Sequence, residues 1–174
     1  MPDAARNAKR SLFASAAGSA NGSPGRATTD RREIMMINRR LRYILRDQNP
    51  LLMRASESVQ KACKAMRERH VGSVLVVDEH ERLLGIFTGR DAVKLLANGK
   101  AGGTTLAHAM TPNPVTIAPE QKAIDALRAM SDGGFRHVPV IERGRIVGVV
   151  SRADFKGEEI DRLDQEEALA ERIW

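Results

Sequence analysis

The chain is poor in aromatic residues and cysteine, and it has no long apolar run. Aromatic side chains make up 3% of the 174 residues, so Val, Ile, Leu, Ala and Met must fill the interior. The single cysteine, Cys63, excludes an internal disulfide framework, and its place on an apolar helical stripe indicates a packed core thiol. No apolar run approaches the roughly 20 residues of a membrane-spanning helix. We therefore expect no transmembrane segment and a cytoplasmic protein.

Motifs for catalysis and for metal binding are also lacking. The four histidines have no metal-ligand spacing with the cysteine or with each other. The sequence contains no His-Glu-x-x-His motif, no Walker phosphate loop and no Gly-x-Ser-x-Gly elbow. These absences favour a binding protein over an enzyme, with no metal site and no catalytic cofactor.

The positive charge is confined to the N-terminal part of the chain. The net charge is +6 overall, and residues 1–46 carry +7 while the remainder carries −1. Residues 1–33 are rich in Ala, Ser, Gly and Arg without hydrophobic periodicity, which indicates a disordered basic arm. Apolar residues at helical spacing over 34–48 predict a leading helix packed on the folded part. A nucleic-acid or anionic-surface role would have to lie in this basic region.

The C-terminal part of the chain carries a net negative charge. Residues 156–174 carry seven acids and three bases, and 157–174 predict an acidic helix. Its apolar positions share one helical face: Ile160, Leu163, Leu169 and Ile173. This face could dock on its own module or on a dimer mate, and a regulatory contact with another protein is the alternative.

A seven-residue pattern occurs twice. Gly85–Asp91 reads GIFTGRD, and Gly148–Asp154 reads GVVSRAD, 63 residues later. Both run glycine, two apolar residues, a hydroxyl residue, two variable residues and aspartate. Asn49-Pro50 likewise returns as Asn113-Pro114, at an offset of 64 residues. A duplicated pattern inside a longer repeat is typical of two related structural units.

The sequence of each repeat predicts the same order of elements: strand, helix, strand, tight turn, strand, hydroxyl–aspartate loop and helix. The units span residues 49–110 and 111–156. Apolar stripes mark the first helices: Val59, Ala62, Cys63 and Met66, then Ala123, Ile124, Leu127 and Met130. The predicted strands are Val74–Val77, Leu83–Phe87, Val138–Ile141 and Ile146–Val150. The helix after the first loop is predicted to begin at Asp91.

The two loop motifs, with Arg136-His137-Val138-Pro139-Val140 before the second hairpin, resemble those of a known family. The chain from about Asn49 to Phe155 is similar to a tandem pair of cystathionine-β-synthase (CBS) domains, the Bateman module, as in stand-alone bacterial CBS proteins. The resemblance implies an α/β (α+β) fold of two β-α-β-β-α units packed sheet to sheet, with flanking terminal helices. It also implies two clefts that commonly bind adenosine compounds, and a homodimer.

The motif residues suit ribose recognition. Asp91 and Asp154 can accept hydrogen bonds from a vicinal diol, and Thr88 and Ser151 can bond the ribose or a phosphate. Alternatively, the two aspartates cap helices, and the two roles are compatible.

Phosphate groups require cations or backbone N–H donors. Arg90 and Arg152 lie within the motifs, and the alternative for both is a solvated surface position. The resemblance places Arg136 and His137 beside both clefts, where a basic pair meets phosphates, whereas His137 alone could also be a core or capping histidine. The resemblance places six further candidates beside the clefts: Gly72, Ser73, Val74, Thr116, Val138 and Pro139.

These observations predict a sensor that binds AMP, ADP or ATP, with NAD(H) as a further candidate. The residues do not separate these ligands from S-adenosylmethionine. Because no effector domain is evident, the output would pass through an unknown regulated protein. The alternative hypothesis is a nucleic-acid or anionic-surface adaptor that acts through the basic arm, with the CBS pair as a scaffold.

Overall fold

The computed structural model describes four stretches of the chain: residues 39–45, 48–100, 102–155 and 157–171. The predicted basic arm, 1–33, lies outside the described residues. Of the predicted leading helix over 34–48, the structure describes the short helix α2, Leu41–Ile44, and residues 34–38 lie outside it.

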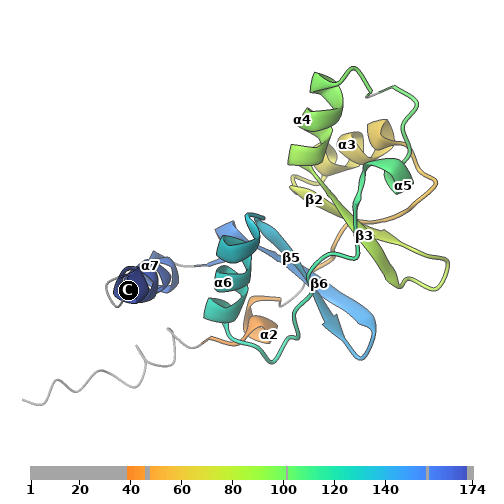
Figure 1. The fold of residues 1–174 in the computed structure, drawn as a ribbon. Helices are drawn as coiled ribbons and strands as arrows, with labels where there is room; N and C mark the ends of the chain where they lie inside the picture. Colours follow the sequence, from red (N-terminus) through yellow and green to blue (C-terminus); the bar gives the residue numbers. More distant parts are fainter. Residues whose placement is uncertain (1–38, 46–47, 101, 156, 172–174) are drawn as a thin grey trace, which may run out of the picture.

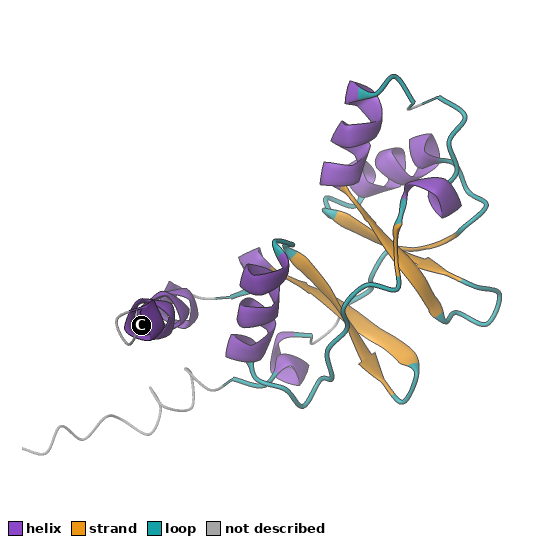
Figure 2. Ribbon diagram, in the orientation of Figure 1, coloured by secondary structure: helices purple, strands orange, loops and turns teal. Residues whose placement is uncertain are grey.

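Two units of strands and helices follow one another, as the repeat predicts (Figure 1). The first contains β1 (Leu52–Arg54), α3 (Val59–Glu68), β2 (Ser73–Val77), β3 (Leu83–Thr88), α4 (Gly89–Ala97) and α5 (Leu106–Ala109). The second contains β4 (Thr111–Pro112), α6 (Ala123–Gly133), β5 (His137–Glu142), β6 (Arg145–Ser151), a 3-10 turn (Arg152–Asp154) and α7 (Gly157–Glu171). In Figure 2 the strands of the two units lie next to each other, with α3, α4 and α5 at one end of the molecule and α6 and α7 at the other. The predicted mixed α/β fold is confirmed.

The first helix of each unit buries the stripe that the periodicity marks. In α3, Val59, Ala62 and Met66 are buried, and Cys63 is half-buried beside them. Burial raises the pKa of the Cys63 thiol. Helix α6 ends at Gly133 and is capped by Gly134, whose φ of +63° is the left-handed conformation that glycine adopts without a steric penalty.

The two sheets share one plan. In the first, the order is β1-β2-β3-β4, with β1 parallel to β2 and the other neighbours antiparallel. In the second, β5 and β6 form an antiparallel hairpin, and Ile117 makes a parallel bridge to Val140 where β1 would lie. The hairpins confirm the predicted strands to within a few residues.

The segment that leads into each unit packs on the other unit. Leu41 is fully buried in the core of the second unit, with Leu127 and Val138, although it precedes the first. Conversely, β4 leads into the second unit and pairs with β3 of the first. The leading glycine of each motif permits this exchange: a Cβ on Gly85 would lie 2.4 Å from Met110 Sδ, and one on Gly148 would lie 2.6 Å from Leu45 Cδ2.

Two helix starts differ from the sequence prediction. Helix α4 begins at Gly89, two residues before the predicted Asp91, because the Asp91 carboxylate accepts the Thr88 N–H from the third helical position.

After the second motif the chain makes only a 3-10 turn before α7 begins at Gly157. Helix α7 covers the described part of the predicted acidic helix, with Leu163 buried and Ile160 half-buried on the second unit, whereas Ile173 lies outside the described residues.

Candidate functional site

Both motif loops are held in the same way by their aspartates. Oδ2 of Asp91 accepts the Thr88 N–H at 2.9 Å and the Thr88 hydroxyl at 2.7 Å. Oδ2 of Asp154 accepts the Ser151 N–H at 2.6 Å and the Ser151 hydroxyl at 2.8 Å. Within the described stretches, Oδ1 of each aspartate accepts no hydrogen bond. Capping therefore uses one oxygen and leaves the other available to a ligand.

The Asp91 loop opens into a cavity of about 610 Å³ between the two units. The first unit supplies Thr88–Asp91 from the β3–α4 junction, and the second supplies Gly133–His137 from the α6–β5 junction. The connecting segment, 111–115, contributes Pro114 and Val115 as apolar wall. A cavity of this size is in the range of small-molecule sites.

Three cationic side chains line this cavity. Arg90 and Lys94 lie one helical turn apart on α4, and Arg136 comes from the loop before β5. Arg90 Nη1 donates to the Gly134 carbonyl at 2.7 Å, which joins the first unit to the C-terminal end of α6. Lys94 and Arg136 have no ion-pair partner in the described part of the chain. The cavity thus combines one carboxylate with cations suited to phosphate groups.

His137 lies between the two motif loops. It lines the cavity, and a Cβ on Gly72 would lie 2.8 Å from its Nε2, so only glycine at residue 72 allows this approach. Burial lowers the pKa of His137, Asp154 acts in the opposite direction, and Arg136 lowers it further. The imidazole is therefore held toward its neutral form, and it is electrostatically coupled to the second motif.

The second motif loop has different surroundings. Arg39 Nη2 donates to the Asp154 backbone carbonyl at 3.2 Å, and the same guanidinium pairs with Glu159 at 3.0 Å. Glu159 is 2% exposed, so this ion pair fixes the start of α7 beside the loop. Asp154, Ser151 and Arg152 are not part of the 610 Å³ lining.

The structure brings six of the fourteen candidate residues to the first cavity: Gly72, Thr88, Arg90, Asp91, Arg136 and His137. Four others are buried in the strands beneath it: Ser73, Val74, Val138 and Pro139. Thr116 lines a neighbouring cavity of about 330 Å³ together with Arg82.

Other lining residues lie outside that candidate set. Lys94 is four residues after Arg90 and shares its helical face, a spacing that could have identified it. Asn113 and Pro114 also line the cavity, and the repeat of Asn49-Pro50 marks that segment. Phe135 has no comparable signal in the sequence.

Neither a metal centre nor a membrane span is evident in the described part of the chain. Its His, Cys, Asp and Glu side chains form no group of three or more that could hold a metal ion. Among the described helices, none is long and apolar enough to cross a membrane.

The sequence model of the CBS domain family matches residues 39–98 and 106–159. The chain therefore belongs to the CBS domain family, and it carries a tandem pair. Among curated proteins, CBS domain-containing protein CBSCBSPB1 of Arabidopsis thaliana is 32% identical over 70% of this chain and 23% of its own length. An uncharacterized 17.7 kDa protein of Acidianus ambivalens is 33% identical over 59% of this chain and 63% of its own. The chain spans about a quarter of the plant relatives that it matches.

Solved CBS structures share the fold. A CBS-domain protein of Agrobacterium tumefaciens, ATU1752, superposes with a TM-score of 0.63 at 30% identity, over 66% of this chain and 89% of its own. The CBS domain pair of protein MJ0100, in complex with 5′-methylthioadenosine and S-adenosyl-L-methionine, gives 0.63 at 28% identity, over 75% and 98%. Protein PAE2072 of Pyrobaculum aerophilum, complexed with AMP, gives 0.66 at 19% identity, over 73% and 99%, a likeness of fold alone.

Proposed function

We propose that this chain is a regulatory module that binds an adenosine nucleotide in the 610 Å³ cavity beside Asp91. The observation that carries the proposal is the hydrogen bonding of the Asp91 carboxylate. Oδ2 is fixed by the Thr88 N–H and hydroxyl, while Oδ1 remains available in a cavity with an apolar wall. A preorganised carboxylate acceptor is what a ribose diol requires.

The charge of the cavity favours a ligand with phosphates. The MJ0100 pair holds 5′-methylthioadenosine and S-adenosyl-L-methionine, neither of which carries a phosphate. In this chain Arg90, Lys94 and Arg136 gather around a single carboxylate. AMP, ADP, ATP and NAD(H) are therefore the ligands we infer, with phosphates directed at Arg90 and Arg136.

The second motif is proposed as a weaker or different adenosine site. Ser151 and Asp154 repeat the ribose chemistry, and Arg152 follows as a phosphate candidate. However, the residue that matches Arg90 in the second motif is Ala153. In addition, the Arg39 side chain donates a hydrogen bond to the Asp154 backbone carbonyl. The two sites are consequently not equivalent.

The regulatory output is proposed to be a population shift. Ligand phosphates would draw Arg90 of the first unit and Arg136 of the second together, and the ligand favours the arrangement that it binds more tightly. The Arg90–Gly134 hydrogen bond already joins the two units at this point. The signal then passes to an unidentified regulated protein, without catalysis by this chain.

We also expect a homodimer through α4. Val93 and Leu96 on this helix are 64% and 67% exposed, an apolar pair that a second copy could cover in a two-fold arrangement. Analytical ultracentrifugation of the wild type and of Val93→Glu/Leu96→Glu tests this. A monomeric wild type would contradict the dimer.

The function is tested by calorimetric titration of AMP, ATP and NADH into nucleotide-free protein. Wild type, Asp91→Ala and Asp154→Ala are compared. We expect Asp91→Ala to weaken binding by about tenfold or more, since a hydrogen bond to a charged group contributes about 1.5–3 kcal/mol, while Asp154→Ala retains this site. Absence of binding by wild type at millimolar ligand would contradict the proposal.

A further inference from the structure

A third cavity lies at the hairpin turns, away from the 610 Å³ cavity beside Asp91, which is called the nucleotide cavity below. Its volume is about 700 Å³, and it lies between the turn joining β2 to β3 and the turn joining β5 to β6. Leu52 and Ile146 give it an apolar floor, and it shares no lining residue with the cavity beside Asp91. Neither CBS motif contributes to it.

The rim of this hairpin cavity is rich in arginine. Arg82 comes from the first turn, and Arg143 and Arg145 come from the second. Nε of Arg82 donates to Asp78 at 2.7 Å, which leaves its terminal nitrogens for another acceptor. Arg143 and Arg145 have no ion pair with any described residue. Glu81 is the one acid in the lining, so arginines outnumber acids by three to one.

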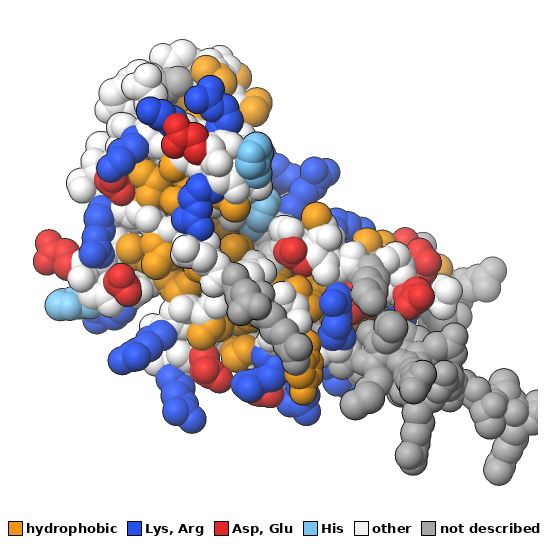
Figure 3. Space-filling view, turned by 180° about the vertical axis from the view of Figure 1, so that it is seen from behind, with side chains coloured by type: hydrophobic (Ala, Val, Ile, Leu, Met, Phe, Trp, Pro, Cys, Tyr) orange, Lys and Arg blue, Asp and Glu red, His pale blue; other side chains and the backbone are white. Residues whose placement is uncertain are grey.

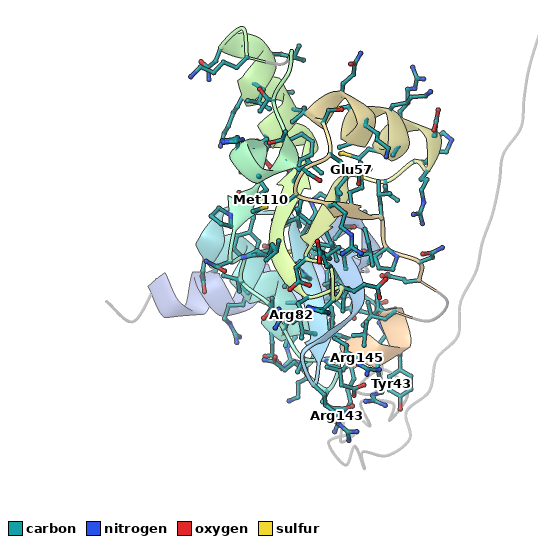
Figure 4. The ribbon with its side chains drawn as sticks, turned by 90° about the vertical axis from the view of Figure 1, so that its right-hand side faces the viewer. Tyr43, Glu57, Arg82, Met110, Arg143 and Arg145 are labelled. Carbon is teal, nitrogen blue, oxygen red and sulfur yellow. The ribbon has the colours of Figure 1, made fainter. Side chains whose placement is uncertain are left out.

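The figures show the arrangement of these cations. In Figure 4, Arg82, Arg145 and Arg143 follow one another along the hairpin end of the module. In Figure 3, Lys and Arg side chains lie along the edge of the molecule opposite the C-terminal helix, with acidic side chains among them. The arginines therefore come from both units and reach one opening.

Both turns are conformationally defined. In the second, Arg143 and Gly144 have φ values of +51° and +78° between the paired residues Glu142 and Arg145, as in a type I′ turn. In the first, Asp78 Oδ1 accepts the N–H groups of His80 and Arg82, each at 2.9 Å. These bonds also lower the pKa of Asp78, whose carboxylate stays ionised. The backbone positions from which the three arginines extend are thus defined before any ligand binds.

We propose that the hairpin cavity binds a small molecule that carries two or more phosphate groups. Guanidinium groups bind phosphate through paired N–H donors, and three of them from two turns match a ligand with several phosphates better than a single anion. The volume suits a molecule of nucleotide size. Such a ligand would bridge the two units at the end opposite the Asp91 cavity.

The 330 Å³ cavity has lining residues in common with both sites. It shares Asn113 and Pro114 with the nucleotide cavity, and it shares Arg82 and Gly144 with the hairpin cavity. A ligand at the hairpins therefore contacts residues adjacent to the connecting segment of the nucleotide site.

The test uses inorganic tripolyphosphate, which has no base or ribose, titrated by calorimetry into the full chain. The hairpin variant is Arg143→Ser/Arg145→Ser. The matched control, Lys64→Ser/Arg67→Ser, removes two exposed cations from α3. Arg90→Ser/Arg136→Ser removes phosphate-binding cations from the nucleotide cavity. All four positions in the hairpin and control variants are exposed, so thermal unfolding should change little.

We expect tripolyphosphate affinity to fall about tenfold in the hairpin variant, to stay within about twofold in the control, and to persist in the Arg90/Arg136 variant. The ATP binding that remains in the Arg90/Arg136 variant should show the same loss when the hairpin substitutions are added, if nucleoside polyphosphates are the source of the phosphates. Equal affinity in the hairpin variant and its control would overturn the proposal. So would loss confined to the Arg90/Arg136 variant, or tight competition by a 20-nucleotide single strand that identifies a nucleic-acid surface.

Discussion

The two motif loops have the same internal chemistry and different surroundings. In each, one aspartate oxygen accepts a backbone N–H and a hydroxyl from the residue three positions earlier. The Asp91 loop begins a nine-residue helix and opens into a 610 Å³ cavity. The Asp154 loop makes one 3-10 turn and is bonded by Arg39. The comparison teaches that a motif fixes its own geometry, while segments from elsewhere in the chain decide what it faces.

The same contrast holds at the pair Gly72-Ser73 and its counterpart Arg136-His137. The second pair brings a cation and an imidazole to the Asp91 cavity, and the absence of a side chain on Gly72 makes room for the imidazole. The segment at Arg136-His137 thereby supplies groups that can bind phosphate, and the segment at Gly72 leaves room for the His137 ring.

The largest expected effect tests the exchange of leading segments between units. Leu41→Ala should lower the free energy of unfolding by about 2–5 kcal/mol, since it leaves a cavity in a packed core. Hydrogen exchange should accelerate in β5 and β6 more than in β2 and β3. Leu106→Ala is the matched control and should show the reverse order. Equal acceleration in both hairpins for both variants would show that the two units form a single cooperative core.

A smaller effect is expected from the ion pair behind the second loop. Glu159→Ala leaves the Arg39 guanidinium, which is 24% exposed, without its partner and should cost about 1–3 kcal/mol. Thermal unfolding measures the loss. Exposed Glu158→Ala is the control, with a change within about 0.5 kcal/mol. Nucleotide affinity at the Asp91 cavity should be unchanged, and a parallel loss of affinity would contradict the independence of the two loops.

Gly72→Ala sharpens the comparison of the matched pairs. The new Cβ would lie 2.8 Å from His137 Nε2 and 3.2 Å from its Cε1, so the ring must move. We expect about 1–2 kcal/mol of destabilisation and weaker binding of AMP, measured by calorimetry. The double variant Gly72→Ala/His137→Ala removes the clash and should recover part of the stability. No recovery would mean that the imidazole is not the obstacle.

The smallest effect is a pH dependence from His137. Its pKa is lowered in the folded state, chiefly by burial. As the pH falls, His137 is therefore protonated in the unfolded chain before it is protonated in the folded one. The stability that depends on neutral His137 is complete above the unfolded pKa of about 6.5 and is lost as the pH falls toward the folded value. The slope should not exceed about 1.4 kcal/mol per pH unit. Urea unfolding between pH 7.5 and 5 should show this slope in wild type and lose it in His137→Gln.

The sequence predicted the repeated elements because their signals are local. The apolar stripe over Val59–Met66 and the alternation around each tight turn depend on neighbours within a few residues. The start of α4 was predicted two residues late, since the sequence marks Asp91 as a cap without showing that its carboxylate reaches back to the Thr88 N–H. Phe135 was missed as a lining residue for a related reason: the meeting of the α6–β5 junction with the first unit is not a local property.

By itself, the sequence determined the two units, their strands and helices, and the pairing of a hydroxyl with an aspartate in each loop. Only the tertiary structure decided that Leu41 belongs to the core of the second unit and that β4 joins the sheet of the first. It also decided that Asp91 opens into the 610 Å³ cavity, while Arg39 bonds the backbone carbonyl of Asp154. The physical reason is range. Periodicity and capping act between residues a few positions apart, whereas the shape and charge of a cavity depend on side chains from distant segments that meet only when the cores form.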